Sequence, residues 1–537
     1  MELERLSPVN NQLLSDYWAE SEKLLPFYQY RYNDESFQVR ANYLKEQNFD
    51  RKKLCHVIYQ FMEPFGISPK TKENLQKLEN GAFAIVGGQQ AGVFTGPLYS
   101  VHKAISVILL AKEQSEKLGI DIVPIFWIAG EDHDIDEINH TFTIVDETPK
   151  KKIYGVPSKK KTIASETSID HSLMKDYIDE IFKDFGETEY TRTLHQSVIE
   201  KMEKSNTFTD FFAHLMNDLF KGEGLLMVDS AFPLIRQYQS SFFQRIIEKN
   251  EAISAAVIEK ERLLEEKGYG TPILATEENA NLFYVRGGER FLLERKNDVF
   301  VNRVANVKFT VEELIAIATR TPEQLSNNVV TRPLMQEMSI PVLAFVAGPG
   351  ELAYWATLKD AFDVLNLQMP ILAPRLNITL LSRQVEQLLD NFGLTVEQVL
   401  AGGIEPLKQQ YIASIQDKEA NEKIANLKEM LDRKYEDLLN YLNSQNLRLE
   451  RIVEKNKQYH HIQFDYLSNK IEQEVQFKHH HIIRQFDRIK SELYPNENLQ
   501  ERIYNPYQYL NIYGSSLISD LLQLPMKISN VHYLVKM

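Results

Sequence analysis

Four consecutive residues, Glu131, Asp132, His133 and Asp134, bring three carboxylates and one imidazole together directly after the apolar run 122–128. Crowding raises the pKa of one carboxylate in such a cluster, which can act as a general base or bind a substrate ammonium group or a metal ion. Alternatively, one of these residues caps a helix and the other acids complement the helix dipole. Both interpretations place the cluster at the end of a strand.

A glycine-rich stretch at 87–92, Gly-Gly-Gln-Gln-Ala-Gly, follows an earlier apolar run at 83–86. A turn at this position leaves backbone N–H groups free, as turns that bind phosphate do. The spacing matches neither G-x-G-x-x-G nor the Gly-Lys-Ser/Thr ending of a P-loop, so it does not identify a dinucleotide or Walker site. We expect Gly88, Gln89 and Gln90 to contact a ligand.

The next stretch, 95–103, resembles a degenerate H-x-G-H signature of the class I nucleotidyl transferases. In those enzymes, histidines at a helix N-terminus stabilise charge on ATP phosphates while an adenylate forms. Tyr99 stands in place of the first histidine and Val101 in place of the glycine. A helix with an incidental histidine accounts for the stretch equally well. On the nucleotidyl-transferase interpretation, the ligand-facing residues are Thr95, Tyr99, His102 and Lys103.

A third candidate segment, Gly348-Pro349-Gly350-Glu351, opens a helix directly after the apolar run 341–346. Its glycines allow the backbone to approach an anion or a sugar closely. Arginine side chains can hold a carboxylate or phosphate with two parallel hydrogen bonds. The candidate ligand contacts of this group are Gly348, Gly350, Glu351, Tyr354, Arg332 and Arg375.

These candidate sites follow apolar runs that predict a parallel β-sheet. Five runs, at 83–86, 122–128, 224–230, 341–346 and 370–373, each end in polar or glycine-rich sequence. In an open parallel sheet, ligands bind outside the carboxyl ends of the strands. The sequence therefore predicts an α/β fold with a Rossmann-like parallel-sheet core of the class I nucleotidyl-transferase type.

The predicted core covers residues 1–385, and its first 80 residues are expected to be mostly helical. Two connective insertions interrupt it, at 143–220 and at 265–325, where short alternating segments predict antiparallel hairpins. We expect a C-terminal antiparallel coiled-coil arm at 386–500. The last segment, 501–537, is expected to dock back on the core.

The predicted arm has no Gly or Pro from Lys418 to Tyr494, and apolar residues recur along it at heptad spacing. One helix of this length would extend about 100 Å, so we expect two antiparallel helices that reverse in the polar stretch 455–461. An exposed helix pair buries its remaining apolar seam against a second subunit, which predicts a homodimer. We expect no Zn site among the arm histidines, because zinc needs several convergent ligands. These histidines are His460, His461, His479, His480 and His481.

The whole chain has 537 residues and a formal net charge of −14. This length predicts about two to four domains. The charge argues against nucleic acid as the main partner, because phosphate binding requires a clustered excess of Lys and Arg. A local basic run at 150–152 and 159–161 is expected to be the solvated edge of a hairpin.

Cys55 is the single cysteine, so no disulfide can form within the chain and a reducing compartment is expected. Its apolar helical surroundings favour a buried thiol over a nucleophile. The N-terminus lacks the pattern of a signal peptide, and no apolar run reaches about 18 residues. We therefore expect a cytoplasmic protein without a membrane partner.

Several of these motifs together resemble one family, the BshC proteins, which are cysteine-adding ligases of bacillithiol biosynthesis. The motifs are the stretches 87–92, 94–99, 127–134, 348–355 and 494–502. The resemblance covers essentially the full length. It implies a Rossmann-like core with two insertions, a coiled-coil arm, a homodimer, and an adenine-nucleotide site near the coiled coil that is distinct from the core cleft.

The resemblance also implies that cysteine is added to glucosaminyl-malate in the last step of making this thiol. Amide formation is uphill in water, so we expect ATP to activate the cysteine carboxyl as an adenylate, and Mg²⁺ could accompany the nucleotide. Asp132 or His133 would take the proton from the attacking nitrogen. Two alternatives remain open: a metal-dependent hydrolase or deacetylase built on the 131–134 cluster, and a non-catalytic scaffold that recruits partners through the arm.

Overall fold

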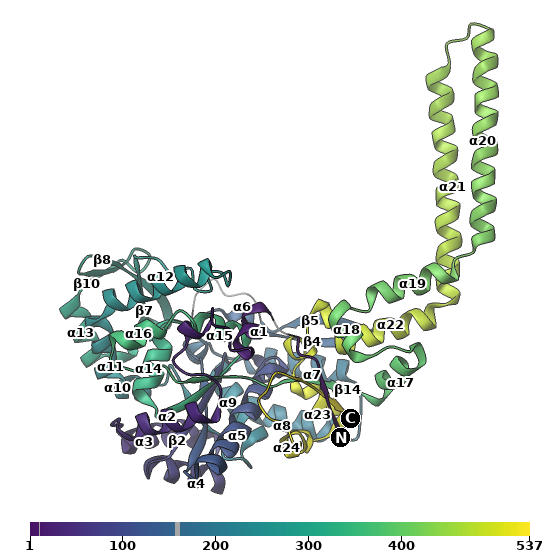
Figure 1. Ribbon diagram of the computed structural model, residues 1–537. Coiled ribbons are helices and arrows are strands. Elements are labelled where there is room, and N and C mark those ends of the chain that lie inside the picture. Colours follow the sequence, from purple (N-terminus) through teal and green to yellow (C-terminus); the bar gives the residue numbers. More distant parts are fainter. Residues whose placement is uncertain (10, 156–161) are drawn as a thin grey trace. The chain divides into compact units, whose positions relative to one another are not determined.

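The computed structural model (Figure 1) describes residues 1–9, 11–155 and 162–537. Its chain divides into two compact units. The first unit comprises residues 1–145, 149–381 and 498–537, and the second comprises 146–148 and 382–497. The first unit contains a parallel sheet with its covering helices, and the second unit is helical.

The first unit is built on five parallel strands in the order β13-β12-β2-β3-β6. The strands are β2 (Phe83–Gln89), β3 (Ile122–Ile128), β6 (Leu226–Asp229), β12 (Val342–Ala347) and β13 (Ile371–Pro374). The chain builds outward from β2 through β3 to β6, and then returns to the other side of β2 with β12 and β13. This is the doubly wound order, with a switch point between β2 and β12. The predicted Rossmann-like core is confirmed.

The two glycines at 87 and 88 belong to strand β2, so the prediction of a turn over 87–92 is wrong for its first half. Both positions are too close to neighbouring atoms for a side chain. A Cβ on Gly88 would lie 2.4 Å from the carbonyl oxygen of Trp127, and one on Gly87 would lie 2.7 Å from Val107 Cγ2. Close packing of β2 against β3 and α5 therefore requires glycine here, independently of any ligand.

Helix α5 (Leu98–Leu118) covers β2 and β3. In the N-terminal region of the chain, helix α2 (Asp34–Lys45) packs against β12 and β13. It is anchored by a buried ion pair in which Arg40 Nη2 lies 2.6 Å from the Glu337 carboxylate. Helices α3 (Arg51–Met62) and α4 (Pro69–Glu79) complete the helical N-terminal region. The predicted helical character of this region holds except for strand β1 (Glu2–Leu6).

The described residues of the first predicted insertion form one small sheet and three α-helices. Strands β4 (His140–Val145) and β5 (Thr148–Ile153) form the sheet, and Lys150–Lys152 lie on β5. The other half of the basic run, 159–161, lies outside the described residues. The helices are α7 (His171–Phe185), α8 (Thr191–Glu203) and α9 (Phe208–Phe220).

The second predicted insertion forms the antiparallel hairpins that the sequence indicated. Its sheet has the order β10-β9-β8-β7-β11. The elements are β7 (Asn279–Arg286), β8 (Glu289–Lys296), β9 (Val299–Asn302), β10 (Val307–Thr310), α13 (Val311–Arg320) and β11 (Leu325–Asn327).

Another sheet of the first unit joins both ends of the chain. Strand β15 (His532–Lys536) pairs with β1 in antiparallel fashion and with β14 (Asn377–Leu381) in parallel fashion. A short 3₁₀ turn, Gln500–Arg502, is tied to β14 because Gln500 exchanges two hydrogen bonds of 2.8 Å with the backbone of Leu380. The C-terminal segment is thus fixed within the first unit.

The second unit contains a long antiparallel helix pair, α20 (Lys418–Ser444) and α21 (Glu450–Lys478), which Figure 1 shows side by side. The chain reverses at 445–449, so the predicted reversal at 455–461 is wrong. Asn446 adopts a left-handed φ of 57°, a conformation that asparagine tolerates well. The polar stretch 455–461 instead lies within α21, because a mostly exposed helix can carry polar residues without ending.

Among the helices of the described ranges, none combines the length and the apolar character needed to cross a membrane. Cys55 lies on α3 with 7% of its surface exposed, and burial raises the pKa of its thiol to about 12. The prediction of a buried thiol is confirmed.

We expect Cys55 in the native protein to react with an aromatic disulfide reagent at pH 8 at least about 100-fold more slowly than in urea, because the thiolate is the reactive form. The rate of release of the coloured thiol measures this directly. Equal rates in native and unfolded protein would contradict the burial of this side chain.

Candidate functional site

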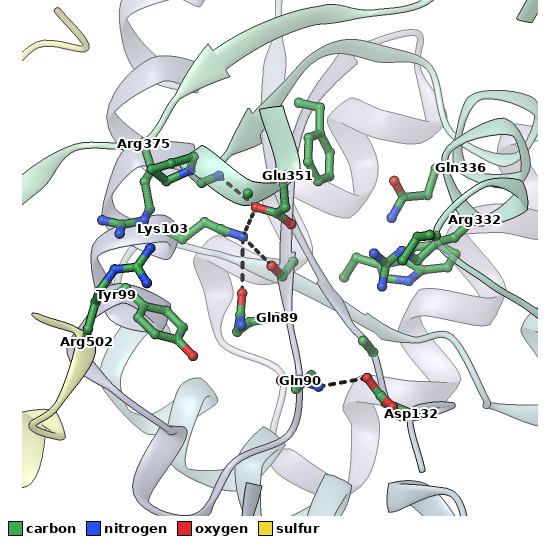
Figure 2. Close-up of a pocket in the computed structure, with 18 residues that line it drawn as sticks. Gln89, Gln90, Tyr99, Lys103, Asp132, Arg332, Gln336, Glu351, Arg375 and Arg502 are labelled. Atoms are coloured by element: carbon green, nitrogen blue, oxygen red, sulfur yellow. Dashed lines mark hydrogen bonds and ion pairs between the residues drawn. The ribbon is translucent and has the colours of Figure 1, made fainter. Parts of the chain in front are cut away.

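A cavity of about 380 Å³ opens at the carboxyl ends of β2 and β12, at the switch point of the sheet (Figure 2). Open α/β sheets bind ligands at this position. The cavity brings together many of the residues predicted from the sequence. These are Gly88, Gln89, Gln90, Tyr99, Lys103, Asp132, Arg332, Gly348, Gly350, Glu351 and Arg375.

Lys103 enters the cavity from α5, and three acceptors hold its ammonium group (Figure 2). Its Nζ lies 2.8 Å from Gly88 O, 3.2 Å from Gln89 Oε1 and 2.5 Å from Glu351 Oε2. Burial lowers the pKa of Lys103, and the Glu351 carboxylate opposes that effect. The same carboxylate accepts the N–H of Gly348 at 2.7 Å and thereby fixes the start of α15 (Pro349–Trp355).

Arg375, which follows β13, makes two parallel hydrogen bonds to the buried carboxylate of Glu501. The distances are 2.8 Å from Nη1 to Oε2 and 2.6 Å from Nη2 to Oε1. Burial alone would raise the pKa of Glu501, but Arg375 and His102 hold it well below its ordinary value. The Arg375 guanidinium also lies 5.8 Å from the ring centroid of Tyr99, within cation–π range.

His102 does not line the cavity, so the expectation that it faces phosphates is wrong. Its side chain is fully buried, and Nδ1 lies 3.0 Å from Glu501 Oε2. Successive helix residues are rotated by about 100°, which directs His102 toward the C-terminal segment while Lys103 faces the cavity. Burial lowers the pKa of His102.

Thr95 is also fully buried and does not line the cavity. It lies in a short left-handed stretch, with φ angles of 52° at Phe94, 67° at Thr95 and 70° at Gly96. This unusual backbone turns the Thr95 side chain into the protein. Its predicted ligand contact is therefore not found.

The residues of the acidic cluster 131–134 lie in different environments. Asp132 lines the cavity, and its Oδ2 accepts a 2.8 Å hydrogen bond from Gln90 Nε2. Burial alone would raise the pKa of Asp132, but the Gln90 bond and the charge of Arg290 hold it below its ordinary value. His133 lies 3.4 Å from Arg290 Nη1, and Asp134 is exposed just before α6 (Ile135–Ile138).

Glu131 is buried away from the cavity, so its predicted contact with substrate is wrong. Its Oε2 lies 2.5 Å from Arg236 Nη2 and 2.8 Å from Ser326 Oγ. This carboxylate links the end of β3 to α10 (Pro233–Tyr238) and β11. Within the described ranges, no group of three or more His, Cys, Asp or Glu side chains is arranged to hold a metal ion. The geometry that the hydrolase alternative requires at 131–134 is therefore not found.

Arg332 lines the cavity from α14 (Thr331–Ser339), and its Nη2 donates to the Tyr354 hydroxyl at 3.1 Å. Tyr354 itself is not part of the cavity lining and instead supports Arg332. Its predicted role is therefore changed from ligand contact to support.

Several residues that complete the cavity were not among the ligand contacts predicted from the sequence. Gln336 is one helical turn beyond Arg332, and Arg502 comes from the C-terminal 3₁₀ turn (Figure 2). No pattern in the sequence connects residue 502 with strands more than a hundred positions earlier. The other unpredicted lining residues are Trp127, Ala129, Val329, Phe345 and Pro349.

The cavity carries more positive than negative side chains. Its cations are Lys103, Arg332, Arg375 and Arg502, and its carboxylates are Asp132 and Glu351. Four positive groups against two negative groups suit a ligand with carboxylate or phosphate groups.

Two family profiles together match nearly the entire chain. One, described as "Bacillithiol biosynthesis BshC, N-terminal Rossmann-like domain", matches residues 1–376, and the other, described as "Bacillithiol biosynthesis BshC, C-terminal coiled-coil domain", matches 378–537. The chain belongs to the BshC family. The resemblance seen in the sequence motifs is confirmed. Residues 498–537 fall within the coiled-coil profile of BshC but lie in the first structural unit, which explains how Arg502 reaches the cavity.

BshC relatives match this chain from end to end. A protein of Lysinibacillus sphaericus named "Putative cysteine ligase BshC" is 54% identical over 536 residues and covers 100% of both chains. Proteins of the same name from Bacillus licheniformis and Bacillus velezensis are 35% identical over 545 residues and 37% identical over 540 residues, again with 100% of both chains covered.

We expect Glu501→Gln to lower the free energy of unfolding by about 3–5 kcal/mol, because it leaves Arg375 buried without a partner charge. Urea denaturation of the full-length variant measures the loss. Adding Arg375→Met to this variant should restore part of the stability, since it removes the unpaired charge. Glu187→Gln, at an exposed position, is the matched control. An unchanged denaturation midpoint for Glu501→Gln would contradict the role assigned to this carboxylate.

Proposed function

We propose that the protein is a ligase that joins the carboxyl group of cysteine to the amine of glucosaminyl-malate in bacillithiol biosynthesis. The end-to-end similarity to relatives named as cysteine ligases supports this proposal. The structural observation that carries it is the electropositive cavity at the switch point of the sheet, which suits two substrates that both bear carboxylates.

Activation of the cysteine carboxyl by ATP makes this amide bond attainable, with an adenylate as the intermediate. The Lys103 ammonium and the Arg375 guanidinium are fixed by carboxylates before any ligand arrives. Such preorganised charges stabilise negative charge that develops on phosphate or acyl oxygens in the transition state. If Mg²⁺ accompanies the nucleotide, the carboxylates of the cavity that could hold it are Asp132 and Glu351.

In the second step the glucosamine nitrogen attacks the acyl carbon, the bond to the AMP oxygen breaks, and the nitrogen loses a proton. Asp132 is the better placed of the two predicted bases, because it lines the cavity whereas His133 does not. Its pKa lies below the ordinary value, so it is ionised and able to accept that proton.

We expect the purified full-length protein to form the amide from ATP, cysteine and glucosaminyl-malate and to release AMP and pyrophosphate. Lys103→Met should lower kcat by about 100-fold or more, the usual effect of losing one preorganised charge. Lys112→Met, at an exposed position of α5, is the matched control. Product masses and released nucleotides are measured by mass spectrometry.

Release of ADP and no AMP would show that the activated intermediate is an acyl phosphate and not an adenylate. Absence of the amide under all conditions would refute the ligase proposal itself.

We also propose that the protein is a homodimer formed through the helix pair of the second unit. Helix α21 exposes a stripe of apolar side chains at Ile452, Tyr459, Tyr466 and Phe477, between 56% and 69% exposed. Their spacing places them on one face of the helix. An apolar stripe of this length on an extended helix suits burial against a second copy of the chain.

We expect a sedimentation mass of twice 62.4 kDa for the wild-type protein. Tyr459→Glu with Tyr466→Glu should give monomers, because charges would then enter an apolar contact. Glu436→Gln, at an exposed position of α20, is the control and should remain dimeric. A monomeric wild type at micromolar concentration would refute the dimer.

A further inference from the structure

A small side pocket of about 40 Å³ adjoins the main cavity. The two share Gln89, Gln90, Tyr99 and Arg502 in their linings, so one ligand can extend from one into the other. A water needs roughly 10–15 Å³ by this measure, so the side pocket has room for a group the size of a carboxylate.

Ser100 lines the side pocket with a hydroxyl that has no hydrogen-bond partner. The residue is only 1% exposed. An unpaired buried hydroxyl is unfavourable unless a ligand or water satisfies it. The hydroxyl can donate to an oxygen atom placed in the pocket.

The side pocket also adjoins the N-terminus of α5, a helix of 21 residues. Pro97 occupies the N-cap position and offers no side-chain cap. Within the part of the chain that the structure describes, the N–H of Tyr99 has no acceptor. The N–H groups of Leu98 and Ser100 already bond to Tyr504 O and Pro97 O, so the Tyr99 N–H is the group of this helix end that is available to an anion.

Arg502 supplies a full positive charge at the side pocket. Its side chain is exposed, and among the described residues no ion pair or hydrogen bond engages its guanidinium. By contrast, Arg375 is bound by Glu501 and Lys103 by Glu351. The turn that carries Arg502 is nevertheless held firmly, because its neighbours Gln500 and Glu501 are both bonded to the core.

Glu137 is the carboxylate in the lining of the side pocket, and its negative charge disfavours the binding of an anion there. Its Oε2 accepts a hydrogen bond of 2.8 Å from Gln90 Nε2. This hydrogen bond satisfies one oxygen of the Glu137 carboxylate. The Arg502 guanidinium and the Ser100 hydroxyl remain available to bind an anion.

We propose that the side pocket is a subsite for an oxyanion, in which Arg502, the Ser100 hydroxyl and the first turn of α5 bind a carboxylate or phosphate group. The rest of the same ligand lies in the main cavity. This assignment rests on the proposed function for the identity of the ligand, which brings either an ATP phosphate or a carboxylate of glucosaminyl-malate.

A direct binding measurement tests the subsite independently of the proposed ligase reaction. Inorganic phosphate and malate are titrated into the full-length protein by calorimetry, with Arg502→Gln, Ser100→Ala and the control Arg192→Gln, which changes an exposed arginine of α8. Arg502→Gln should raise the dissociation constant of at least one probe by about 10- to 100-fold, and Ser100→Ala by a smaller factor. Arg192→Gln should bind as the wild type does. Wild-type affinity of Arg502→Gln for both probes would overturn the subsite.

The ligase assay then identifies the source of the anion. A higher KM for ATP in Arg502→Gln, with the KM for glucosaminyl-malate unchanged, assigns a phosphate to the side pocket. The opposite pattern assigns a carboxylate, and two unchanged KM values overturn the proposal. If anion binding depends on Arg502 but no amide forms, the proposed reaction is wrong and the subsite stands.

Discussion

The ion pair between Lys103 and Glu351 joins the two halves of the doubly wound sheet where they diverge. Lys103 lies on the helix after β2, and Glu351 lies on the helix after β12. Because the chain leaves these neighbouring strands in opposite directions, the backbone itself leaves a gap at their ends. The ion pair crosses this gap, and it also orders the loop at Gly348 through the same carboxylate. The shape of the cavity therefore depends on one partly buried contact between residues that lie 248 positions apart.

The C-terminal segment completes the cavity that lies at the ends of the parallel strands. Glu501 binds Arg375 and His102, which lie 126 and 399 positions earlier in the chain. Since a buried carboxylate is stable only with opposite charge nearby, these contacts fix the 3₁₀ turn against the core. Two neighbouring residues of that turn then have separate roles. Glu501 stabilises the fold, whereas Arg502 points its charge toward the cavity and the side pocket.

The positive groups of the cavity fall into two kinds. Lys103 and Arg375 have carboxylate partners that hold them in place, which makes them suited to stabilise charge in a transition state. Arg332 is supported by a neutral tyrosine hydroxyl, and Arg502 by no ion pair among the described residues. Neither of these two guanidinium groups is in an ion pair with a described residue, although the charges of Glu131 and Glu351 act on Arg332. This division agrees with a reaction in which anionic substrates are bound at one place and activated at another.

The sequence by itself determined the parallel core, its five strands and the family, because buried strands that end in polar turns leave a pattern within a few neighbouring residues. It also located most of the cavity lining, including Gln89, Lys103, Asp132 and Glu351. Only the tertiary structure decided which members of each motif face the ligand. His102 and Glu131 have the right chemistry, but helix rotation and the buried partner Arg236 direct them into the core. Arg502 belongs to a motif of the family resemblance, 494–502, but its place at the cavity could not be predicted, because it depends on contacts between residues distant in the chain, and such contacts leave no local pattern.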